Sequence, residues 1–177
     1  MLYYTYYESP VGKVMLLASE EALAGLWLPG QKVDQQLMAR AVFQDYTPIL
    51  EQGRTWLDRY FSGGQPTPEE IPLDPQGSVF RKRVWRRLCK IPYGQLETYG
   101  QIARELGAEN RGKMSAQAVG GAVGHNPIAL IIPCHRVIGA NGNLVGYGGG
   151  LALKKRLLYH EGVDIRTLHD PQQKHAK

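Results

Sequence analysis

Short apolar runs and helical spacing alternate along the first third of the chain. Residues 14–18 and 23–28 are rich in apolar side chains and predict two strands, and residues 9–12 predict the turn that joins a first strand to the second. Apolar residues recur at helical spacing over 34–43 and 50–61, which predicts two helices. We expect a small antiparallel sheet with these helices packed on it.

The pattern becomes mostly helical beyond residue 77. Phe80, Val84 and Leu88 recur every fourth residue and predict an amphipathic helix over 80–90, with basic side chains on its other faces. Cys89 lies beside this apolar stripe, so we expect it to be a core thiol. A last helix is predicted over residues 151–161.

Two short helices are predicted between these. Thr98 and Gln101 have the spacing of a capping box, so a helix is expected to begin there and to end at Gly107. Ser115 is the predicted N-cap of a second short helix that runs through residue 123. The loop between them contains three turn-forming residues: Gly107, Asn110 and Gly112. The pair has the proportions of a helix-turn-helix.

Prolines and glycines are concentrated over residues 62–77, where they exclude a continuous helix or strand. We therefore divide the chain into a supporting N-terminal domain with its linker (1–76), a C-terminal domain (77–162) and a polar tail (163–177). The tail is expected to be mobile. The predicted fold class is α+β, with a small antiparallel sheet and helices followed by a mostly helical domain.

The two halves of the chain differ in charge. Residues 1–76 hold 5 Lys and Arg against 10 Asp and Glu, whereas residues 77–177 hold 16 against 6. Lysine and arginine concentrated on one module attract phosphates and make binding sensitive to salt. The C-terminal domain is therefore a candidate for binding a polyanion, although charge alone fits a solvated basic surface equally well.

Composition narrows the class of protein. No uninterrupted apolar run is longer than five residues, which is too short for a membrane span. The start of the chain lacks the basic flank and apolar stretch of a secretory signal, so we expect a cytoplasmic protein that does not associate with membranes. The two cysteines, Cys89 and Cys134, are too few for a disulfide framework. We expect a monomer.

Glycines mark three further segments. Gly120 and Gly121 lie in the second short helix, where they cost stability relative to alanine and therefore need a reason. Tight packing of helices is one explanation, and a nucleic-acid backbone lying against the helix is the other. Residues 139–143 predict a hairpin-type turn, and the glycine-rich residues 146–150 predict a loop that closes over a flat substrate.

The candidate chemistry lies in residues 133–137, Pro-Cys-His-Arg-Val, directly after the apolar run 128–132. Cys134 is either a small buried hydrophobe or a nucleophile. The attacking form of a cysteine is the thiolate, which a neighbouring imidazole or cation can populate near neutral pH. Adjacent side chains on a strand face opposite ways, so His135 reaches the thiol only through a turn after Pro133 or a bridging water.

Three motifs together resemble the O6-alkylguanine-DNA alkyltransferase family: Asn126-Pro127, Pro133-Cys134-His135-Arg136-Val137 and Tyr159-His160-Glu161-Gly162. The resemblance covers residues 78–162. It implies a ribonuclease H-like N-terminal domain and a winged-helix-like C-terminal domain. It also implies that an alkyl group moves from O6 of a damaged guanine to a cysteine sulfur, once per molecule and without a cofactor.

The resemblance implies a role for each residue of the site. Cys134 is the implied alkyl acceptor, held as a thiolate, and His135 is implied to remove its proton through a water. Glu161 is implied to orient the imidazole and to stabilise its charged form, as in a triad. Asn126 is implied to hold the backbone that positions the cysteine. Tyr99 is implied to donate toward the guanine as negative charge develops on it.

The implied partner is double-stranded DNA carrying O6-alkylguanine, whose damaged nucleotide has to be flipped out of the duplex. The carbonyls of Cys134 and Val137 are expected to accept from the guanine amine, and Tyr147 and Gly148 to lie in the loop that closes on the base. Gln117 stands where the family has an arginine that fills the gap in the stack. The predicted DNA-binding residues are Ser115, Gln117, Ala118, Gly120, Gly121 and Arg136.

The main alternative is a non-catalytic helix-turn-helix protein that senses alkylated DNA, against which the presence of Cys134 argues. A helix-turn-helix regulator of undamaged DNA leaves Cys134, His135 and Glu161 unexplained. A cysteine hydrolase needs an oxyanion-hole motif that is not apparent. No metal is expected, because no cluster has zinc-ligand spacing. Neither the preferred alkyl size nor activity on O4-alkylthymine follows from the sequence.

Overall fold

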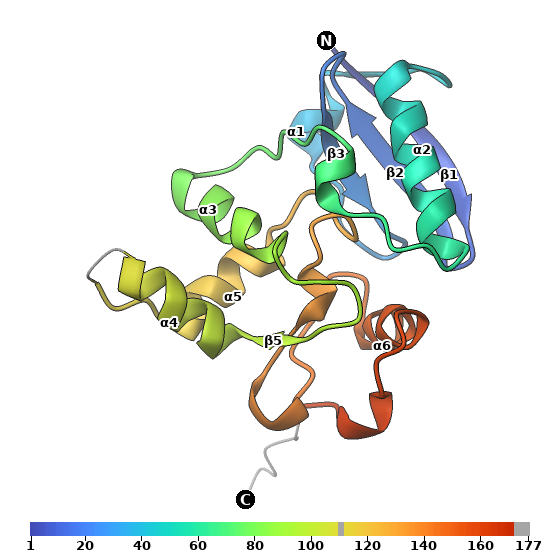
Figure 1. Ribbon diagram of the computed structural model, residues 1–177. Helices are drawn as coiled ribbons and strands as arrows, with labels where there is room; N and C mark the ends of the chain where they lie inside the picture. The colour runs from blue at the N-terminus through green and yellow to red at the C-terminus, as the bar shows by residue number, and fades with distance from the viewer. Residues whose placement is uncertain (110–111, 172–177) are drawn as a thin grey trace, which may run out of the picture.

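The computed structural model describes residues 1–109 and 112–171 (Figure 1). A four-stranded sheet with a helix packed on it lies at one end of the molecule, and helices α3 to α6 lie toward the other. The α+β fold class predicted from the sequence is confirmed. The loop residue Asn110 and the last part of the tail lie outside the described residues.

The N-terminal sheet has the strand order β3-β2-β1-β4. Its strands are β1 (Leu2–Ser9), β2 (Gly12–Ala18), β3 (Leu23–Trp27) and β4 (Ala41–Phe43). The first three are antiparallel neighbours, as predicted, with the expected turn between β1 and β2. The predicted helix α2 (Pro48–Phe61) begins at Thr47, whose Oγ1 accepts from the Leu50 amide, and its buried face packs on this sheet.

The predicted helix over 34–43 is wrong. Asp34 caps only a single turn, α1 (Gln35–Met38), in which Leu37 is the buried residue. Residues 41–43 instead form β4, which pairs in parallel with β1 and makes the sheet mixed rather than purely antiparallel. The edge of β1 offers unpaired backbone groups, and pairing with them outweighs a helical pattern that buries very little apolar surface.

The described part of the second half contains four α-helices and a two-stranded parallel sheet. The helices are α3 (Val79–Leu88), α4 (Tyr99–Glu109), α5 (Ala116–Gly124) and α6 (Leu151–His160), and the strands are β5 (Glu97–Thr98) and β6 (Val137–Ile138). The predicted helix pair is present, because α4 and α5 pack on each other. The reciprocal hydrogen bonds of Thr98 and Gln101 begin the first, and the Ser115 hydroxyl caps the second.

Gly107 does not end α4 as predicted. The helix continues to Glu109, and Gly107 is buried inside it. A Cβ at this position would lie 2.8 Å from the carbonyl oxygen of Gly112. Because Gly107 has no Cβ, the chain can pass close to it on the way to α5. The role of this glycine is therefore packing and not the ending of a helix.

Residues 139–143 form a turn but not a hairpin, because β6 pairs with β5 while Asn143 pairs with His169. His169 belongs to the polar tail, whose expected mobility stays a prediction; its described residues contact the second half. Two backbone hydrogen bonds join His169 to the segment around the turn, and Leu168 beside it is buried. Backbone pairing and burial together hold this part of the tail on the second half.

Strand β3 connects the sheet to the segment that precedes the reactive cysteine. The amide of Leu26 donates to the carbonyl of Pro127 at 2.9 Å, and the amide of Ala129 donates to the carbonyl of Leu26 at 3.0 Å. Apolar residues from both halves form one continuous hydrophobic core. The chain just ahead of Cys134 is therefore anchored on the N-terminal sheet.

Candidate active site

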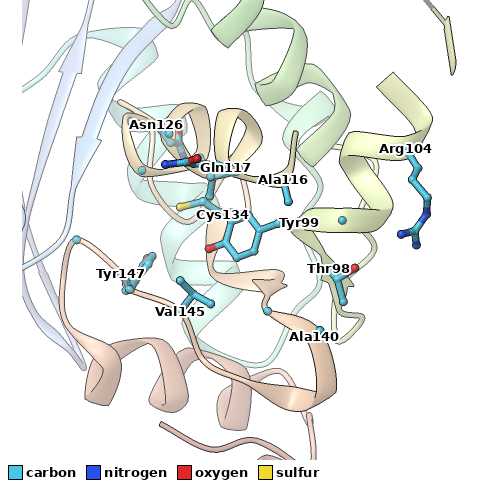
Figure 2. Close-up of a pocket in the computed structure, with 18 of the residues that line it drawn as sticks. Thr98, Tyr99, Arg104, Ala116, Gln117, Asn126, Cys134, Ala140, Val145 and Tyr147 are labelled. Atoms are coloured by element: carbon cyan, nitrogen blue, oxygen red, sulfur yellow. The ribbon is translucent and has the colours of Figure 1, made fainter. Parts of the chain in front are cut away.

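Cys134 opens a short 3-10 helix, Cys134–Arg136, directly after Pro133. Its side chain is 5% exposed and lies in the wall of a cavity of about 870 Å³ that α4, α5 and residues 145–148 help to line (Figure 2). The chain therefore turns directly after Pro133, which is one of the two arrangements that the sequence allows. Within the described residues no hydrogen bond joins the thiol to His135 directly, so a bridging water fits this geometry better than direct contact.

Asn126 clamps the segment that leads to the cysteine. Its Nδ2 donates to the carbonyl of Ile132 at 2.9 Å, and its Oδ1 accepts from the amide of Ile128 at 3.0 Å. Between these two points Leu130 has a φ of 72°, a conformation that costs a non-glycine residue about 1 kcal/mol. The side-chain amide and the burial of Leu130 hold this strained segment in place, and the thiol at its end is thereby fixed.

His135 is completely buried behind the cysteine. Its Nε2 lies 2.5 Å from Oε2 of Glu161, the residue that follows α6. An ionised carboxylate can only accept, so Nε2 carries the imidazole proton and Nδ1 presents a lone pair. Within the part of the chain that the structure describes, Nδ1 has no hydrogen-bond partner. The imidazole is therefore a base that a carboxylate orients, which is the arrangement of a catalytic triad.

Burial decides the resting charge of the thiol and the imidazole. It raises the pKa of Cys134, and the Asn126 amide and the Lys154 ammonium offset this only in part. Burial likewise lowers the pKa of His135, although the carboxylate of Glu161 acts in the opposite direction. Both directions favour a neutral thiol beside a neutral imidazole in the free protein. Deprotonation has to accompany the reaction.

The carboxylate of Glu161 is fully paired although it is buried. Oε2 accepts from the Tyr60 hydroxyl at 2.7 Å as well as from His135. Oε1 accepts from Nε of Arg136 at 2.7 Å and from the amide of Gly94 at 3.0 Å. Burial alone would raise the pKa of this carboxyl, but the hydrogen bonds from His135 and Arg136 and the charge of Arg136 hold it well below its usual range. Glu161 is therefore ionised at neutral pH.

The structure contradicts the prediction that Arg136 contacts DNA. The residue is 4% exposed, its Nη1 donates to the carbonyl of Ile91 at 2.7 Å, and its guanidinium lies over the ring of Tyr93. A buried charge without a partner costs several kcal/mol, so Arg136 and Glu161 neutralise each other inside the protein. The motif places an arginine next to the nucleophile in sequence but does not determine which way its side chain points.

Three of the predicted substrate contacts line the cavity: Tyr99, Tyr147 and Gly148. Tyr99 points into it beside Cys134 (Figure 2), and burial raises the pKa of Tyr99 to about 12, so its hydroxyl remains a donor at neutral pH. The Tyr147 hydroxyl is buried beside the thiol of Cys134, and burial together with that neighbour raises the pKa of Tyr147 well above its usual value. It therefore remains a donor in the cavity at neutral pH.

Helix α5 presents small side chains to the outside next to this cavity. Its buried residues are Val119, Ala122 and Val123, and its exposed positions, with the N-cap, include Ser115, Gln117, Ala118 and Gly121. A Cβ on Gly120 would make ordinary contact with the Tyr99 ring at 3.8 Å, whereas one on Gly121 would meet nothing within 4 Å. Packing inside the protein therefore does not explain Gly121, and close approach by a nucleic-acid backbone stays a prediction for this glycine.

Two family models account for nearly the whole chain. Residues 2–75 match the ribonuclease-like domain of 6-O-methylguanine DNA methyltransferase, and residues 79–163 match its DNA binding domain. The chain belongs to the 6-O-methylguanine DNA methyltransferase family. This confirms the resemblance that rests on the Asn-Pro, Pro-Cys-His-Arg-Val and His-Glu-Gly motifs.

Relatives of this methyltransferase match it over both halves. The methylated-DNA–protein-cysteine methyltransferase of Haemophilus influenzae is 40% identical over 168 residues, which are 92% of this chain and 87% of the relative. The Mycolicibacterium paratuberculosis protein of the same name is 42% identical over 158 residues, 89% and 91% of the two chains. A crystal structure of Mycobacterium tuberculosis O6-methylguanine methyltransferase superposes with a TM-score of 0.79 at 38% identity, covering 91% and 93%. A structure of the M. tuberculosis protein in complex with DNA gives 0.78, covering 90% and 93%.

Lys154 belongs to the site of this methyltransferase, and the sequence analysis missed it. Its completely buried Nζ donates to the carbonyl of Val137 at 2.6 Å and to that of Val145 at 3.3 Å. Burial lowers the pKa of Lys154 to about 8, while a thiolate at Cys134 acts to raise it. A signal was available, because Lys154 shares the buried face of α6 with Leu157, three residues further on.

The second thiol of the methyltransferase, Cys89, is partly buried and packs against the core. Burial raises the pKa of Cys89 to about 11, and the residues that line the active-site cavity include Cys134 but not Cys89. Among residues 1–109 and 112–171, no three His, Cys, Asp or Glu side chains are grouped as metal ligands. A search of the same residues finds no helix with the length and apolarity that crossing a membrane requires.

Proposed function

We propose that this protein repairs double-stranded DNA by moving the alkyl group of O6-alkylguanine irreversibly to Sγ of Cys134. The observation that supports this most directly is a cysteine in the wall of a cavity with a carboxylate-oriented imidazole behind it. The relatives are named for methyl transfer from DNA to a protein cysteine, and one neighbouring structure contains DNA. A sensor without chemistry has no use for this arrangement.

The proposed reaction is a single displacement at carbon. The damaged nucleotide leaves the duplex and its base enters the cavity. His135 takes the thiol proton through a water while Sγ of Cys134 attacks the alkyl carbon. The bond between sulfur and carbon forms as the bond between that carbon and O6 breaks, and the electron pair stays on the guanine. Glu161 stabilises the resulting imidazolium, and Tyr99 donates toward the base as its charge develops.

The neutral resting state suits a residue that is used once. Oxidation and unwanted alkylation of a cysteine follow its thiolate character and its exposure, and Cys134 has little of either in the free protein. A base that fills the cavity excludes bulk water from the cavity side of the sulfur and brings the electrophilic carbon to it. The acceptor is therefore protected until a substrate arrives.

The exposed face of α5 is the proposed contact with DNA. Small side chains at Ala118 and Gly121 let a nucleic-acid backbone approach closely, and Gln117 at the mouth of the cavity is placed to fill the gap that the flipped base leaves. The excess of basic residues after position 77 supplies the attraction for phosphates. The carbonyl of Val137 accepts from Lys154 and retains a second lone pair for the guanine amine.

The product is a thioether, and nothing in the site returns it to a thiol, so each molecule is expected to act once. We propose that the protein works as a monomer in the cytoplasm, where a reducing environment keeps the acceptor thiol free. Action on O4-alkylthymine is a further expectation, since its O4 substituent presents the same electrophilic carbon.

Intact-protein mass spectrometry tests the proposal. After incubation with a duplex oligonucleotide that bears O6-methylguanine, the protein should gain one methyl group that maps to Cys134. Cys134→Ser should gain none, and Cys89→Ser should react like the wild type. A folded wild-type protein that binds this DNA and gains no methyl group would overturn the proposal in favour of a sensor. Several methyl groups removed per protein molecule would contradict single use.

A further inference from the structure

Tyr60 is a buried residue of α2 whose hydroxyl reaches the active site from the other half of the molecule. Its ring stacks on Trp56 with the centroids 5.6 Å apart, and Phe61 and Tyr93 meet it edge-on. The hydroxyl donates to Oε2 of Glu161 at 2.7 Å. Aromatic packing on several sides holds the ring, so the hydroxyl is aimed at this oxygen.

Two consecutive residues at the end of α6 hold Tyr60 at two points. The ring of His160 lies 5.0 Å from the Tyr60 ring, and its Nε2 lies 2.7 Å from the Tyr60 carbonyl oxygen. Glu161 accepts the hydroxyl. The end of α6 therefore binds both the backbone and the side chain of Tyr60. The position of the Glu161 carboxylate depends in turn on where α2 packs.

The oxygen that Tyr60 contacts is the one that orients the imidazole. Oε2 accepts from Tyr60 and His135, whereas Oε1 accepts from Arg136 and Gly94. A carboxylate oxygen offers two lone-pair directions, so the hydroxyl occupies one and leaves the other for Nε2 of His135. Burial and the charge of Glu161 raise the pKa of Tyr60 far above its usual value, so its hydroxyl acts only as a donor.

We propose that Tyr60 is a positioning residue for alkyl transfer, through which the N-terminal half sets the direction and strength of the hydrogen bond between Glu161 and His135. The proposal rests on the function proposed above and extends it. It assigns the N-terminal half a part in the chemistry beyond mechanical support of the second half.

Removal of the Tyr60 hydroxyl has an effect of definite sign. The hydroxyl draws negative charge from Oε2, so without it the carboxylate becomes a stronger acceptor and stabilises the imidazolium form of His135. Below its pKa the imidazole of His135 is already protonated and cannot take the thiol proton, so a higher pKa extends this inactive range to higher pH. The charged groups that face His135, apart from Tyr60 behind the carboxylate, are Glu161, Arg136 and Lys154, and none of them is altered by the change.

The test removes a single oxygen atom. Tyr60→Phe keeps the ring and its stacking, and methyl transfer from an O6-methylguanine duplex is followed in single-turnover experiments across a range of pH. We expect the rate to fall about tenfold, because a hydrogen bond to a charged group and the alignment it provides are lost. We also expect the acid limb of the pH–rate profile to move to higher pH. A slower reaction with an unshifted acid limb would reduce Tyr60 to a packing residue and overturn the proposal.

Tyr93→Phe is the matched control. It removes a hydroxyl from the same aromatic cluster, but that hydroxyl contacts the carbonyl of His160 at 3.4 Å and not the carboxylate of Glu161. Both the rate and the acid limb should stay near those of the wild type. A fluorotyrosine introduced at position 60 gives the opposite test, since it retains the hydroxyl as a stronger donor and should move the acid limb to lower pH.

Titration of the His135 imidazole by NMR provides a readout that does not depend on alkyl transfer. Its pKa should be higher in Tyr60→Phe than in the wild type, and the same spectra show whether the variant is folded. If the wild type transfers no methyl group, the proposed function fails while this titration still tests Tyr60. If the wild type does transfer it and neither the profile nor the imidazole pKa changes in Tyr60→Phe, the function stands and the role of Tyr60 is wrong.

Discussion

Nζ of Lys154 lies 2.6 Å from the carbonyl oxygen of Val137, and both residues are completely buried next to the reactive cysteine. The ammonium does two things from this position. It holds the carbonyl of Val137, which we propose as an acceptor for the guanine amine, and its charge lowers the pKa of the Cys134 thiol against the effect of burial. Burying a lysine lowers the stability of the protein, so such a residue is kept where function requires it. Its presence on an apolar helix face therefore indicates a role in the chemistry.

Lys154→Met should slow methyl transfer by about tenfold or more, because the developing thiolate loses the ammonium whose charge lowers its pKa. The pH dependence gives a second readout. With the pKa of Lys154 near 8, the ammonium is present below that pH and is lost above it, so the wild-type rate should carry a contribution that declines above about pH 8. This decline should be absent in the variant, which single-turnover rates across pH would show.

Lys155→Met is the control for this change. Lys155 is adjacent in sequence, and its Nζ pairs with Asp170 at the surface at 2.8 Å. The substitution Lys155→Met should leave the rate of methyl transfer and the pH dependence of that rate unchanged. Equal effects of the two substitutions would mean that the overall charge of the domain, and not the buried ammonium, is responsible.

Glu161→Gln should destabilise the protein by about 3 kcal/mol at neutral pH, because Arg136 is left buried without its counter-charge. The folded-state pKa of Glu161 lies below the unfolded value of 4.5, so its contribution is complete above that value and is lost as the pH falls further. The stability gap between wild type and variant should therefore narrow on acidification below about pH 4.5. Chemical denaturation at several pH values measures the gap, and one that is constant across pH would contradict the ion-pair explanation.

The sequence predicted the chemistry more completely than the geometry. The Asn-Pro, Pro-Cys-His-Arg-Val and His-Glu-Gly motifs identified the family. They also named the site residues Asn126, Cys134, His135 and Glu161, because a local motif shows directly which reactive groups are present. Tyr60 and Gly94 escaped notice, since only the folded chain brings them to Glu161 from 101 and 67 residues away. Arg136 was assigned outward because a motif does not encode burial.

The helices and strands likewise divide into those that local sequence specifies and those that depend on distant partners. Helices with a strong apolar stripe or a capping residue, such as α2 and α5, lie where the pattern predicts them, because local interactions specify them. Strand β4 was missed because its three residues gain their stability from a partner, β1, that is distant in the sequence. The mobility expected of the tail from its polarity stays a prediction, and Leu168 and the pairing of His169 with Asn143 hold its described part.

Gln117→Arg should strengthen the binding of DNA that contains the lesion. Gln117 is exposed at the mouth of the cavity, where a guanidinium could both fill the vacated stack and attract phosphates. We expect affinity to rise several-fold and the slope of log affinity against log salt to steepen by about one. Titrations of Cys134→Ser with labelled duplex at several salt concentrations measure both without reaction. The same change at the exposed Gln44, in the acidic half, is the control, and an equal gain there would show a general charge effect.

Gly121→Ala separates the two explanations of the small-residue helix. A Cβ at Gly121 meets nothing within 4 Å in the free protein, so alanine should raise stability by about 1 kcal/mol through its higher helix propensity. If a DNA backbone lies against this face, the added methyl should weaken DNA binding while leaving the intrinsic reactivity of Cys134 toward free O6-methylguanine unchanged. Thermal unfolding, duplex titration and reaction with the free base distinguish these effects. A more stable protein that binds DNA as tightly as the wild type would exclude α5 as the close-contact surface, because the open side of Gly121 would then face only solvent.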